Sequence, residues 1–119
     1  MKNHFQLLGD QGEDFAVTYL IEKGYQIIVR NLYTPYGEID IIARKDGIIA
    51  IVEVKTRSTE FFGSPADAVN LRKQKKIRQS ALWWLQEIKS QGQEVRFDVL
   101  GLIKRKEEWE ITHWAGSFE

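Results

Sequence analysis

The sequence predicts a small α/β domain whose elements follow the order helix, three strands, helix and two strands. Two patterns predict this class. Two long segments repeat apolar residues at the 3.6-residue spacing of a helix, and five shorter segments are rich in Ile, Val and aromatic residues. A length of 119 residues suits one domain with its own core, so residues 1–119 are treated as a single unit.

The composition excludes several classes of protein. With 17 basic and 17 acidic residues the net charge is zero, which excludes a globally basic nucleic-acid binder but not a local basic patch. The absence of cysteine excludes disulfides and thiolate metal sites and suits a reducing cytosol. The longest apolar run, Ile48 to Val52, is too short to span a bilayer, and the N-terminal segment lacks the apolar core of a signal peptide. We therefore expect a cytoplasmic protein without a membrane partner.

The first helix is expected at about residues 6–23. Its apolar stripe has helical spacing, and Gly24 is well placed to end it; the stripe comprises Phe15, Ala16, Tyr19 and Leu20. Glu13 lies three residues before Ala16 and therefore falls on the buried side. A carboxylate there is either an edge residue of the buried face or a third acidic contributor to a site.

The first strand is expected at residues 25–33, followed by a turn at residues 34–37. Arg30 and Asn31 lie near the end of this strand. They are either a hydrogen-bonding pair beside the turn or a phosphate contact.

The segment 37–55 carries most of the functional information and reads as a β-hairpin. Two runs rich in Ile and Val flank Asp46-Gly47, a dipeptide typical of a type I′ turn. With these as the loop residues, the register places Asp40 opposite Glu53. A three-residue loop would slip this register and move the two carboxylates to opposite faces.

Because side chains alternate between faces along a strand, Glu38 and Asp40 lie on one face of the first hairpin strand. Glu53 and Lys55 likewise lie on one face of the second. Most other positions are Ile, Val or Ala, as expected for strands buried on both faces. Opposed carboxylates in such a setting repel each other, so a divalent cation between Asp40 and Glu53 is their natural partner. The ammonium of Lys55 could then orient a water or stabilise charge developing at phosphorus.

The alternative is a cross-strand salt bridge between Glu38 and Lys55, with Asp40 and Glu53 at a solvated end of the sheet. Charged residues are common in strands, so the spacing alone does not separate the two interpretations. The purity of the flanking apolar runs favours the metal site, because solvated strand faces carry many polar residues.

Residues 56–63 read as a loop, with Arg57 near the end of the second hairpin strand. Phe61 and Phe62 either fold under this loop or face a partner or a nucleobase. Ser64-Pro65 is a helix start, with the serine as the N-cap.

The second main helix is expected at about residues 70–91, ended by Gly92. Its buried stripe comprises Ile77, Ala81, Trp84, Leu85 and Ile88. Lys73 and Gln74 project from the same face one turn further along, so at least one should reach the end of the sheet.

Five cations occupy seven residues near the start of this helix: Arg72, Lys73, Lys75, Lys76 and Arg78. Such a run is usually a solvated face. The helix macrodipole disfavours cations at an N-terminal end, which makes a phosphate-binding role more plausible here.

Two further strands are expected at residues 95–103 and 109–114, around a turn at residues 104–106. His4 and His113 are isolated, without metal-ligand spacing, and are interpreted as structural or surface residues. The sequence has no glycine-rich phosphate loop and no nucleophile elbow.

This order of elements, with Asp-x12-Glu-x-Lys across the hairpin, resembles the PD-(D/E)XK, or restriction-endonuclease-like, nuclease superfamily. More narrowly, the chain resembles the YraN family of bacterial proteins, which is uncharacterised in the main and is similar to the archaeal Holliday junction resolvases. The residues that carry the resemblance are Gly12-Glu13, Arg30-Asn31, Gly37-Glu38-Ile39-Asp40, Glu53-Val54-Lys55-Thr56-Arg57, Gly63-Ser64-Pro65, Lys73 and Phe97-Asp98-Val99.

The resemblance implies a restriction-endonuclease-like fold, with a mixed central sheet flanked by helices. It implies a metal held by Asp40 and Glu53, with Lys55 as the catalytic lysine. Glu13 would match the helix-borne acidic residue of the resolvase-like branch. The proline that the superfamily carries before the aspartate is replaced here by Ile39.

We therefore expect an endonuclease dependent on Mg²⁺ or Mn²⁺ that acts on DNA rather than RNA, with branched or junction DNA as one candidate substrate. The nucleic-acid contacts are expected from Arg30, Arg57, Arg72, Lys73, Lys75 and Lys76. Cutting both strands of a junction would call for a homodimer with two sites. The alternative is a non-catalytic nucleic-acid-binding or repair-complex adaptor that retains the fold.

Overall fold

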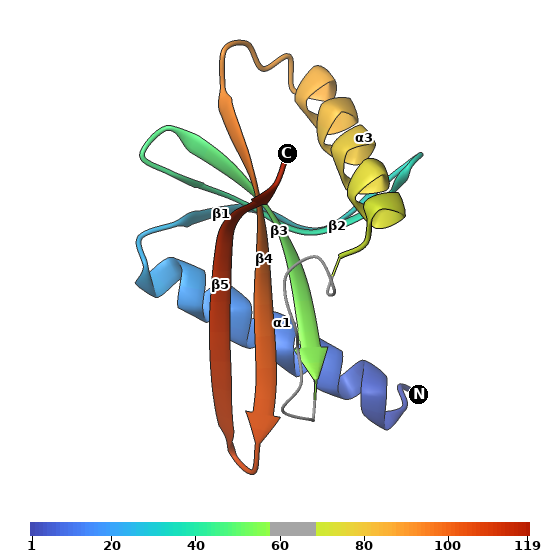
Figure 1. Cartoon of the computed structure of the whole chain (residues 1–119), viewed down its shortest axis with the longest axis vertical. Helices are drawn as coiled ribbons and strands as arrows, with labels where there is room; N and C mark the ends of the chain where they lie inside the picture. The colour runs from blue at the N-terminus through green and yellow to red at the C-terminus, as the bar shows by residue number, and fades with distance from the viewer. Residues whose placement is uncertain (58–68) are drawn as a thin grey trace.

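The computed structural model describes residues 1–57 and 69–119, which form a five-stranded sheet with one helix on each face (Figure 1). The helices are α1 (His4–Glu22) and α3 (Leu71–Glu87); the strands are β1 (Gln26–Thr34), β2 (Gly37–Lys45), β3 (Ile48–Arg57), β4 (Glu94–Arg105) and β5 (Glu108–Phe118). The strands lie in sequence order, with β3 and β4 parallel and the other neighbours antiparallel. This mixed sheet confirms the predicted class and order and fits a restriction-endonuclease-like fold.

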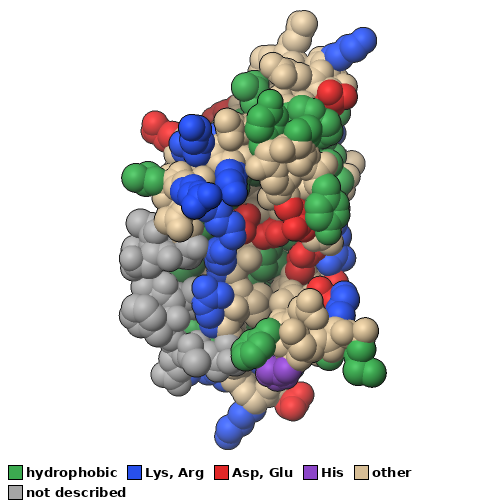
Figure 2. Space-filling view, turned by 90° about the vertical axis from the view of Figure 1, so that its right-hand side faces the viewer, with side chains coloured by type: hydrophobic (Ala, Val, Ile, Leu, Met, Phe, Trp, Pro, Cys, Tyr) green, Lys and Arg blue, Asp and Glu red, His purple; other side chains and the backbone are tan. Residues whose placement is uncertain are grey.

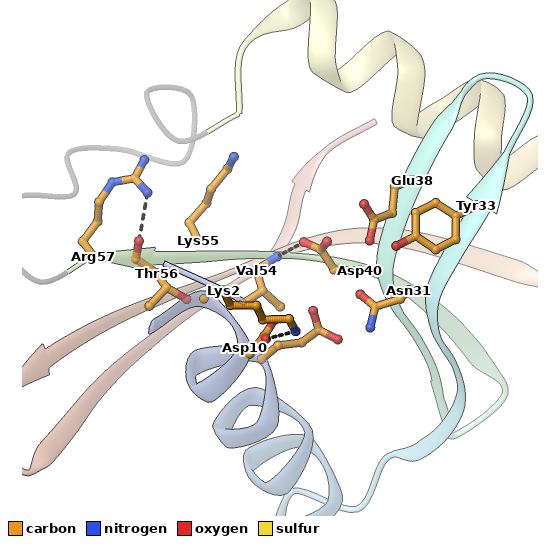
Figure 3. A pocket seen from close by; sticks show the side chains of 12 residues that line it. Lys2, Asp10, Asn31, Tyr33, Glu38, Asp40, Val54, Lys55, Thr56 and Arg57 are labelled. Carbon is orange, nitrogen blue, oxygen red and sulfur yellow. Dashed lines mark hydrogen bonds and ion pairs between the residues drawn. The ribbon is translucent and has the colours of Figure 1, made fainter. Parts of the chain in front are cut away.

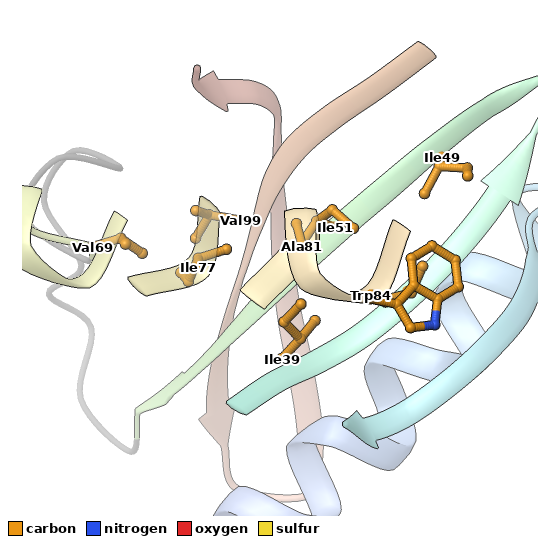
Figure 4. Close-up of a cluster of buried hydrophobic side chains, with 9 residues drawn as sticks. Ile39, Ile49, Ile51, Val69, Ile77, Ala81, Trp84 and Val99 are labelled. Atoms are coloured by element: carbon orange, nitrogen blue, oxygen red, sulfur yellow. The ribbon is translucent and has the colours of Figure 1, made fainter. Parts of the chain in front are cut away.

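The central strands contribute side chains to both faces of the sheet. On one face α1 packs over Ile41, Ala43, Ala50, Val52, Leu100 and Leu102. On the other, α3 packs over Ile39, Ile42, Ile49, Ile51 and Val99 (Figure 4). Because each face is covered by a helix, these strands read as nearly continuous apolar runs.

The β2–β3 hairpin has the predicted turn and register. Asp46 and Gly47 adopt φ values of 52° and 78°, the left-handed backbone that a type I′ turn requires at both central positions. The pairing keeps this register from Lys45 opposite Ile48 to Ile41 opposite Val52 and stops there, so the predicted backbone pair of Asp40 with Glu53 does not form.

Both helices are capped by asparagine, which shifts their boundaries. The side chain of Asn3 accepts a hydrogen bond from the backbone N–H of Gln6, so α1 begins at His4 rather than near Gln6. Asn70 caps α3 in the same way through the N–H of Lys73.

The predicted end of the second helix at Gln91 and Gly92 is wrong. The helix ends at Glu87, because Lys89 adopts a left-handed φ of 53° and the N–H of Ser90 bonds back to the carbonyl of Leu85. Ile88 therefore leaves the predicted buried stripe and is 49% exposed.

The predicted helix start at Ser64-Pro65 and the aromatic residues Phe61 and Phe62 lie outside the described residues. Across residues 1–57 and 69–119, neither helix has the length and apolar character needed to cross a membrane.

The last two strands are longer than predicted and enclose a buried carboxylate. The side chain of Asp98 is fully buried, and it accepts two hydrogen bonds of 2.8 Å from Arg96. It also accepts one from the backbone N–H of Gly116 and lies 2.8 Å from Nε2 of His113. The hydroxyl of Tyr19 lies 3.1 Å from Nδ1 of His113, so the cluster ties α1 to the β4–β5 hairpin.

Burial acts to raise the pKa of Asp98, but the hydrogen bonds from His113, Arg96 and Gly116 outweigh it and lower the pKa to about 2. The carboxylate is therefore stable in its ionised form inside the core. The structural interpretation of His113 is confirmed by these contacts, and His4 is an exposed residue.

Helix α1 lies against β3 at Gly12. A Cβ at this position would overlap Oγ1 of Thr56 and lie 2.9 Å from its Cγ2 and 3.1 Å from its Cβ, so the two elements could not keep this spacing without a shift. A Cβ at Gly9, one turn earlier, would meet nothing within 4 Å. The missing side chain at Gly12 thus lets α1 carry Glu13 close to the end of the sheet.

Gly12→Ala should lower the free energy of unfolding by about 1–3 kcal/mol, because the added methyl overpacks the contact with Thr56. Gly9→Ala is the matched control and should stabilise the protein by up to about 1 kcal/mol through helix propensity. Urea unfolding of both variants tests the claim, and equal stabilisation by both substitutions would contradict it.

Candidate functional site

The site lies where β2 and β3 separate, and we call this place the fork. The last backbone pair joins Ile41 to Val52. Beyond it, a carboxylate oxygen of Asp40 accepts a hydrogen bond of 2.8 Å from the backbone N–H of Val54 (Figure 3). The Asp40 side chain thus occupies the place of the carbonyl that would have continued the ladder.

The strand alternation changes at the same point. Ile39 packs toward α3 and Ile41 toward α1, although a regular strand would place them on one face. On the neighbouring strand, Asn31 adopts a left-handed φ of 51°. These irregularities direct Asp40 across the fork rather than squarely onto one face of the sheet.

The fork opens into a pocket of about 470 Å³. It is lined from α1 and the residues before it by Lys2, Gly9, Asp10 and Glu13, from β1 and β2 by Asn31, Tyr33, Glu38 and Asp40, and from β3 by Val54, Lys55, Thr56 and Arg57. Figure 2 shows carboxylates gathered in the middle of one face, with a row of Lys and Arg side chains beside them.

Four carboxylates from three elements act on one another at the fork: Glu13, Glu38, Asp40 and Glu53. Burial, followed by the negative charge of Glu53, raises the pKa of Asp40 to about 7. Burial, followed by the charge of Glu13, also raises the pKa of Glu38. The fork therefore concentrates negative charge, and water screens it least at Glu53, which is buried, and more at Glu38, which is exposed.

Two ammonium groups face the most buried of these carboxylates. Glu53 is 6% exposed, and its Oε1 lies 2.9 Å from Nζ of Lys73 and 3.8 Å from Nζ of Lys55. Burial, followed by the nearby charge of Lys73, lowers the pKa of Lys55 to about 8. A lysine with this pKa can exchange a proton near neutral pH.

These contacts disfavour the salt-bridge alternative. The ion pair that Lys55 forms within the described segments is with Glu53 rather than with Glu38. Glu53 is buried instead of lying at a solvated end of the sheet.

The donor chemistry at the fork fits a hard divalent cation. Asp40 and Glu53 offer carboxylate oxygens, and a cation would relieve the repulsion that raises the pKa of Asp40. No group of three or more His, Cys, Asp or Glu side chains with metal-site geometry occurs in residues 1–57 and 69–119. A site with two carboxylates still suits Mg²⁺, which commonly binds one or two carboxylates and keeps several waters. Their assignment as ligands stays a prediction.

The predicted nucleic-acid contacts fall into three groups. Arg72, Lys75 and Lys76 are exposed on α3, while Lys73 turns inward to Glu53. Arg57 lines the pocket. Arg30 bonds to both Glu13 and Asp14, so its charge is already paired within the protein.

The structure adds features that sequence reasoning missed. Tyr33 lines the pocket from β1 beside Asn31, for which the sequence leaves a phosphate contact open. The hydroxyl of buried Ser80 lies 2.8 Å from that of Thr34, which ties α3 to the tip of the β1–β2 hairpin. The expectation that Lys73 or Gln74 reaches the end of the sheet is confirmed for Lys73. The direct contact with Glu53 was not predicted, because it joins two elements that are distant in sequence.

The chain is an α/β protein that fits a restriction-endonuclease-like fold, with a pocket at the end of its sheet that brings carboxylates and cations together. Residues 12–102 match the model of uncharacterised protein family UPF0102. The chain is 42% identical to a UPF0102 protein of Syntrophotalea carbinolica over 94% of its own length and 91% of the relative's. It is 45% identical to one of Thermodesulfovibrio yellowstonii over 93% and 95% of the two lengths. The chain belongs to the UPF0102 family, which agrees with the YraN-like resemblance.

Replacing Asp40 by Asn should raise stability at alkaline pH. The folded-state pKa of about 7 lies above the ordinary value of 3.8, so between these pH values the folded protein holds a proton that the unfolded chain releases. Stability that depends on Asp40 therefore falls as the pH rises through this window. In chelator, Asp40→Asn should be more stable than wild type by about 1–2 kcal/mol at pH 8, and the difference should vanish below about pH 4.

Urea unfolding across this pH range provides the measurement. Glu87→Gln, which neutralises an exposed carboxylate at the end of α3, is the control and should leave the pH dependence unchanged. A difference between Asp40→Asn and wild type that is constant with pH would show that Asp40 does not titrate as described.

Proposed function

We propose that this protein is an endonuclease dependent on Mg²⁺ or Mn²⁺ that hydrolyses phosphodiester bonds in DNA. The observation that carries the proposal is the fork itself. Asp40 and Glu53 are partly or fully buried at one end of the sheet, and the ammonium of Lys55 lies 3.8 Å from Glu53. This is an arrangement suited to holding a cation beside a proton-exchanging lysine.

Each residue has a distinct role in this proposal. Asp40 and Glu53 would hold the ion, which when bound would polarise a phosphoryl oxygen and lower the pKa of a water. Lys55, whose pKa is lowered to about 8 by burial and by Lys73, would orient the attacking water or stabilise charge on the phosphate. Glu13, held by Arg30 at 3.3 Å, would border the pocket from α1.

The basic side of α3 supports a nucleic-acid substrate. Arg72, Lys75 and Lys76 are exposed on the helix that also sends Lys73 to the fork. Cations along one helix beside an acidic pocket could hold phosphates in a strand that crosses the site. The resemblance of the sequence motifs to those of junction resolvases makes branched DNA, cut by a symmetric dimer, a candidate substrate within this proposal.

One observation favours a second candidate, a non-catalytic adaptor that binds nucleic acid. Lys73 and Lys55 already balance part of the negative charge of the fork within the chain. A protein that needed no metal could keep such a site. The adaptor would bind nucleic acid equally well in chelator, whereas the nuclease needs a divalent ion for cleavage.

Cleavage should require metal, Asp40 and Lys55. Labelled four-way junction, nicked, duplex and single-stranded DNA, with an RNA of matching sequence, would be incubated with Mg²⁺, Mn²⁺ or chelator. Asp40→Ala should abolish cleavage by removing a ligand, and Lys55→Ala should abolish it without weakening metal binding, because an ammonium is not a metal ligand. Glu87→Ala is the control and should retain full activity. Absence of metal-dependent cleavage on every substrate would overturn the enzyme and leave the adaptor.

Reversing two exposed charges on α3 should weaken nucleic-acid binding without unfolding the protein. The double variant with Lys75→Glu and Lys76→Glu should flatten the dependence of log K on log salt by about one unit for each phosphate that it no longer neutralises. The control combines Lys23→Glu with Lys89→Glu, which makes the same change in net charge away from the start of α3. Equal affinities and slopes for the two double variants would assign the basic run to a solvated face.

A further inference from the structure

Two ammonium groups share a single carboxylate oxygen at the fork. Nζ of Lys73 lies 2.9 Å from Oε1 of Glu53, and Nζ of Lys55 lies 3.8 Å from the same atom. The Glu53 side chain is 7% exposed, so its charge is compensated mainly by neighbouring groups rather than by water. The shorter of the two contacts comes from a helix, not from the strand that carries the proposed catalytic lysine.

The two lysines differ in how readily their ammonium groups can move away from Glu53. The Lys55 side chain is 15% exposed and extends from β3, the central strand of the sheet, whereas the Lys73 side chain is 41% exposed. The backbone of Lys73 is fixed, because its N–H is bonded to the side chain of Asn70 at 2.9 Å and α3 is anchored by buried Ile77. The Lys73 ammonium can therefore turn outward on its flexible stem while the helix stays in place.

A divalent cation at Glu53 would stand close to the Lys73 ammonium. Like charges at such a distance repel strongly where water is scarce, so the two cations compete for one carboxylate. The more exposed of the two lysines can relieve the repulsion by moving into solvent. Arg72, Lys75 and Lys76 lie exposed on the same helix, so an outward Lys73 would extend this basic surface.

We infer that Lys73 is a tethered counter-ion that a divalent metal displaces from Glu53, and that the displaced ammonium then binds a phosphate of the nucleic acid. The inference rests on the metal site of the proposed function. It makes Lys73 a positioning residue that couples metal binding to substrate binding. In the metal-free protein the Lys73 ammonium balances the charge of Glu53. It becomes available to bind a phosphate only after a metal has replaced it there.

Metal binding to the protein alone tests the competition. Isothermal titration with Mn²⁺, in the absence of nucleic acid, would compare wild type with Lys73→Met and Lys75→Met. Lys73→Met should bind Mn²⁺ about tenfold more tightly than wild type, because the substitution removes a competing cation. Lys75→Met removes the same charge from the exposed side of the same helix and should change the affinity by less than about twofold. Equal Mn²⁺ affinity in wild type and Lys73→Met would overturn the inference.

Thermal melts with and without Mn²⁺ provide a second test, which stays informative if Lys73→Met is less stable than wild type. Without Lys73, the ion pair that Glu53 keeps within residues 1–57 and 69–119 is the longer one with Lys55, so Lys73→Met should melt at a lower temperature than wild type in chelator. Mn²⁺ should then raise its melting temperature by more than it raises that of wild type, because tighter binding stabilises the folded state more. Lys73→Arg keeps the charge and should retain the wild-type metal response. A smaller or equal metal-induced shift in Lys73→Met would contradict the competition.

DNA binding tests the second half of the inference. Ca²⁺, which also takes oxygen ligands, would replace the catalytic ion in an anisotropy assay with junction DNA. Wild type should gain affinity on addition of Ca²⁺, and Lys73→Met should gain about threefold less, while Lys75→Met should lose affinity equally with and without Ca²⁺. An equal gain in wild type and Lys73→Met would refute the phosphate contact.

The outcomes separate this inference from the proposed function. Tighter Mn²⁺ binding by Lys73→Met, in a protein that cleaves no substrate, would support the role of Lys73 as a counter-ion and overturn the proposed nuclease activity. Cleavage by wild type together with unchanged Mn²⁺ affinity in Lys73→Met would do the reverse. Failure of wild type and Lys73→Met alike to bind Mn²⁺ would overturn both.

Discussion

The left-handed backbone of Asp46 and Gly47 fixes the register of β2 against β3, and the arrangement of the site depends on that register. It sends Ile51 toward α3 and Val52 toward α1, so Glu53 emerges on the side of α3 and meets Lys73. A slip of one residue would reverse every one of these directions, bury a carboxylate against the apolar side of α1 and expose half of the core. The hydrophobic packing on both faces therefore holds the polar site in place.

The fork is a local departure from the sheet that the surrounding fold sustains. Pairing of β2 with β3 stops after Ile41, and the β1–β2 tip is held toward α3 by the bond between Thr34 and Ser80. On the opposite face, the absent side chain of Gly12 lets α1 close against Thr56. The pocket lies between these two attachments. A continuous ladder would satisfy more backbone groups, so the separation of the strands is more readily understood as serving the site than as serving stability.

The sequence predicts the parts of this structure that local patterns determine. Helical spacing and runs rich in Ile and Val were enough for the element order, and the turn chemistry at Asp46-Gly47 was enough for the hairpin register. Regular strand alternation fails at Asp40, where Ile39 and Ile41 pack on opposite faces of the sheet. The end of α3 was missed, because a left-handed residue at Lys89 is not signalled by periodicity. The pairing of Lys73 with Glu53 and the cluster around Asp98 were missed for another reason. Each joins side chains from separate elements, and only tertiary packing decides which of several nearby polar groups meet.

Two aspartates, one fully buried and one partly buried, differ in how the surrounding residues treat their charge. Asp98 receives hydrogen bonds from Arg96 and Gly116 and contacts His113, and these partners lower its pKa to about 2 despite burial. Asp40 receives a hydrogen bond from the N–H of Val54, while burial and the charge of Glu53 raise its pKa to about 7. The surroundings thus stabilise the ionised form of Asp98 and destabilise the ionised form of Asp40. A carboxylate whose negative charge is balanced by neighbouring donors needs no further ligand. A carboxylate that lies beside other carboxylates gains stability from an added cation. This difference, rather than burial or acidity alone, supports the fork as the cation site of the proposed function.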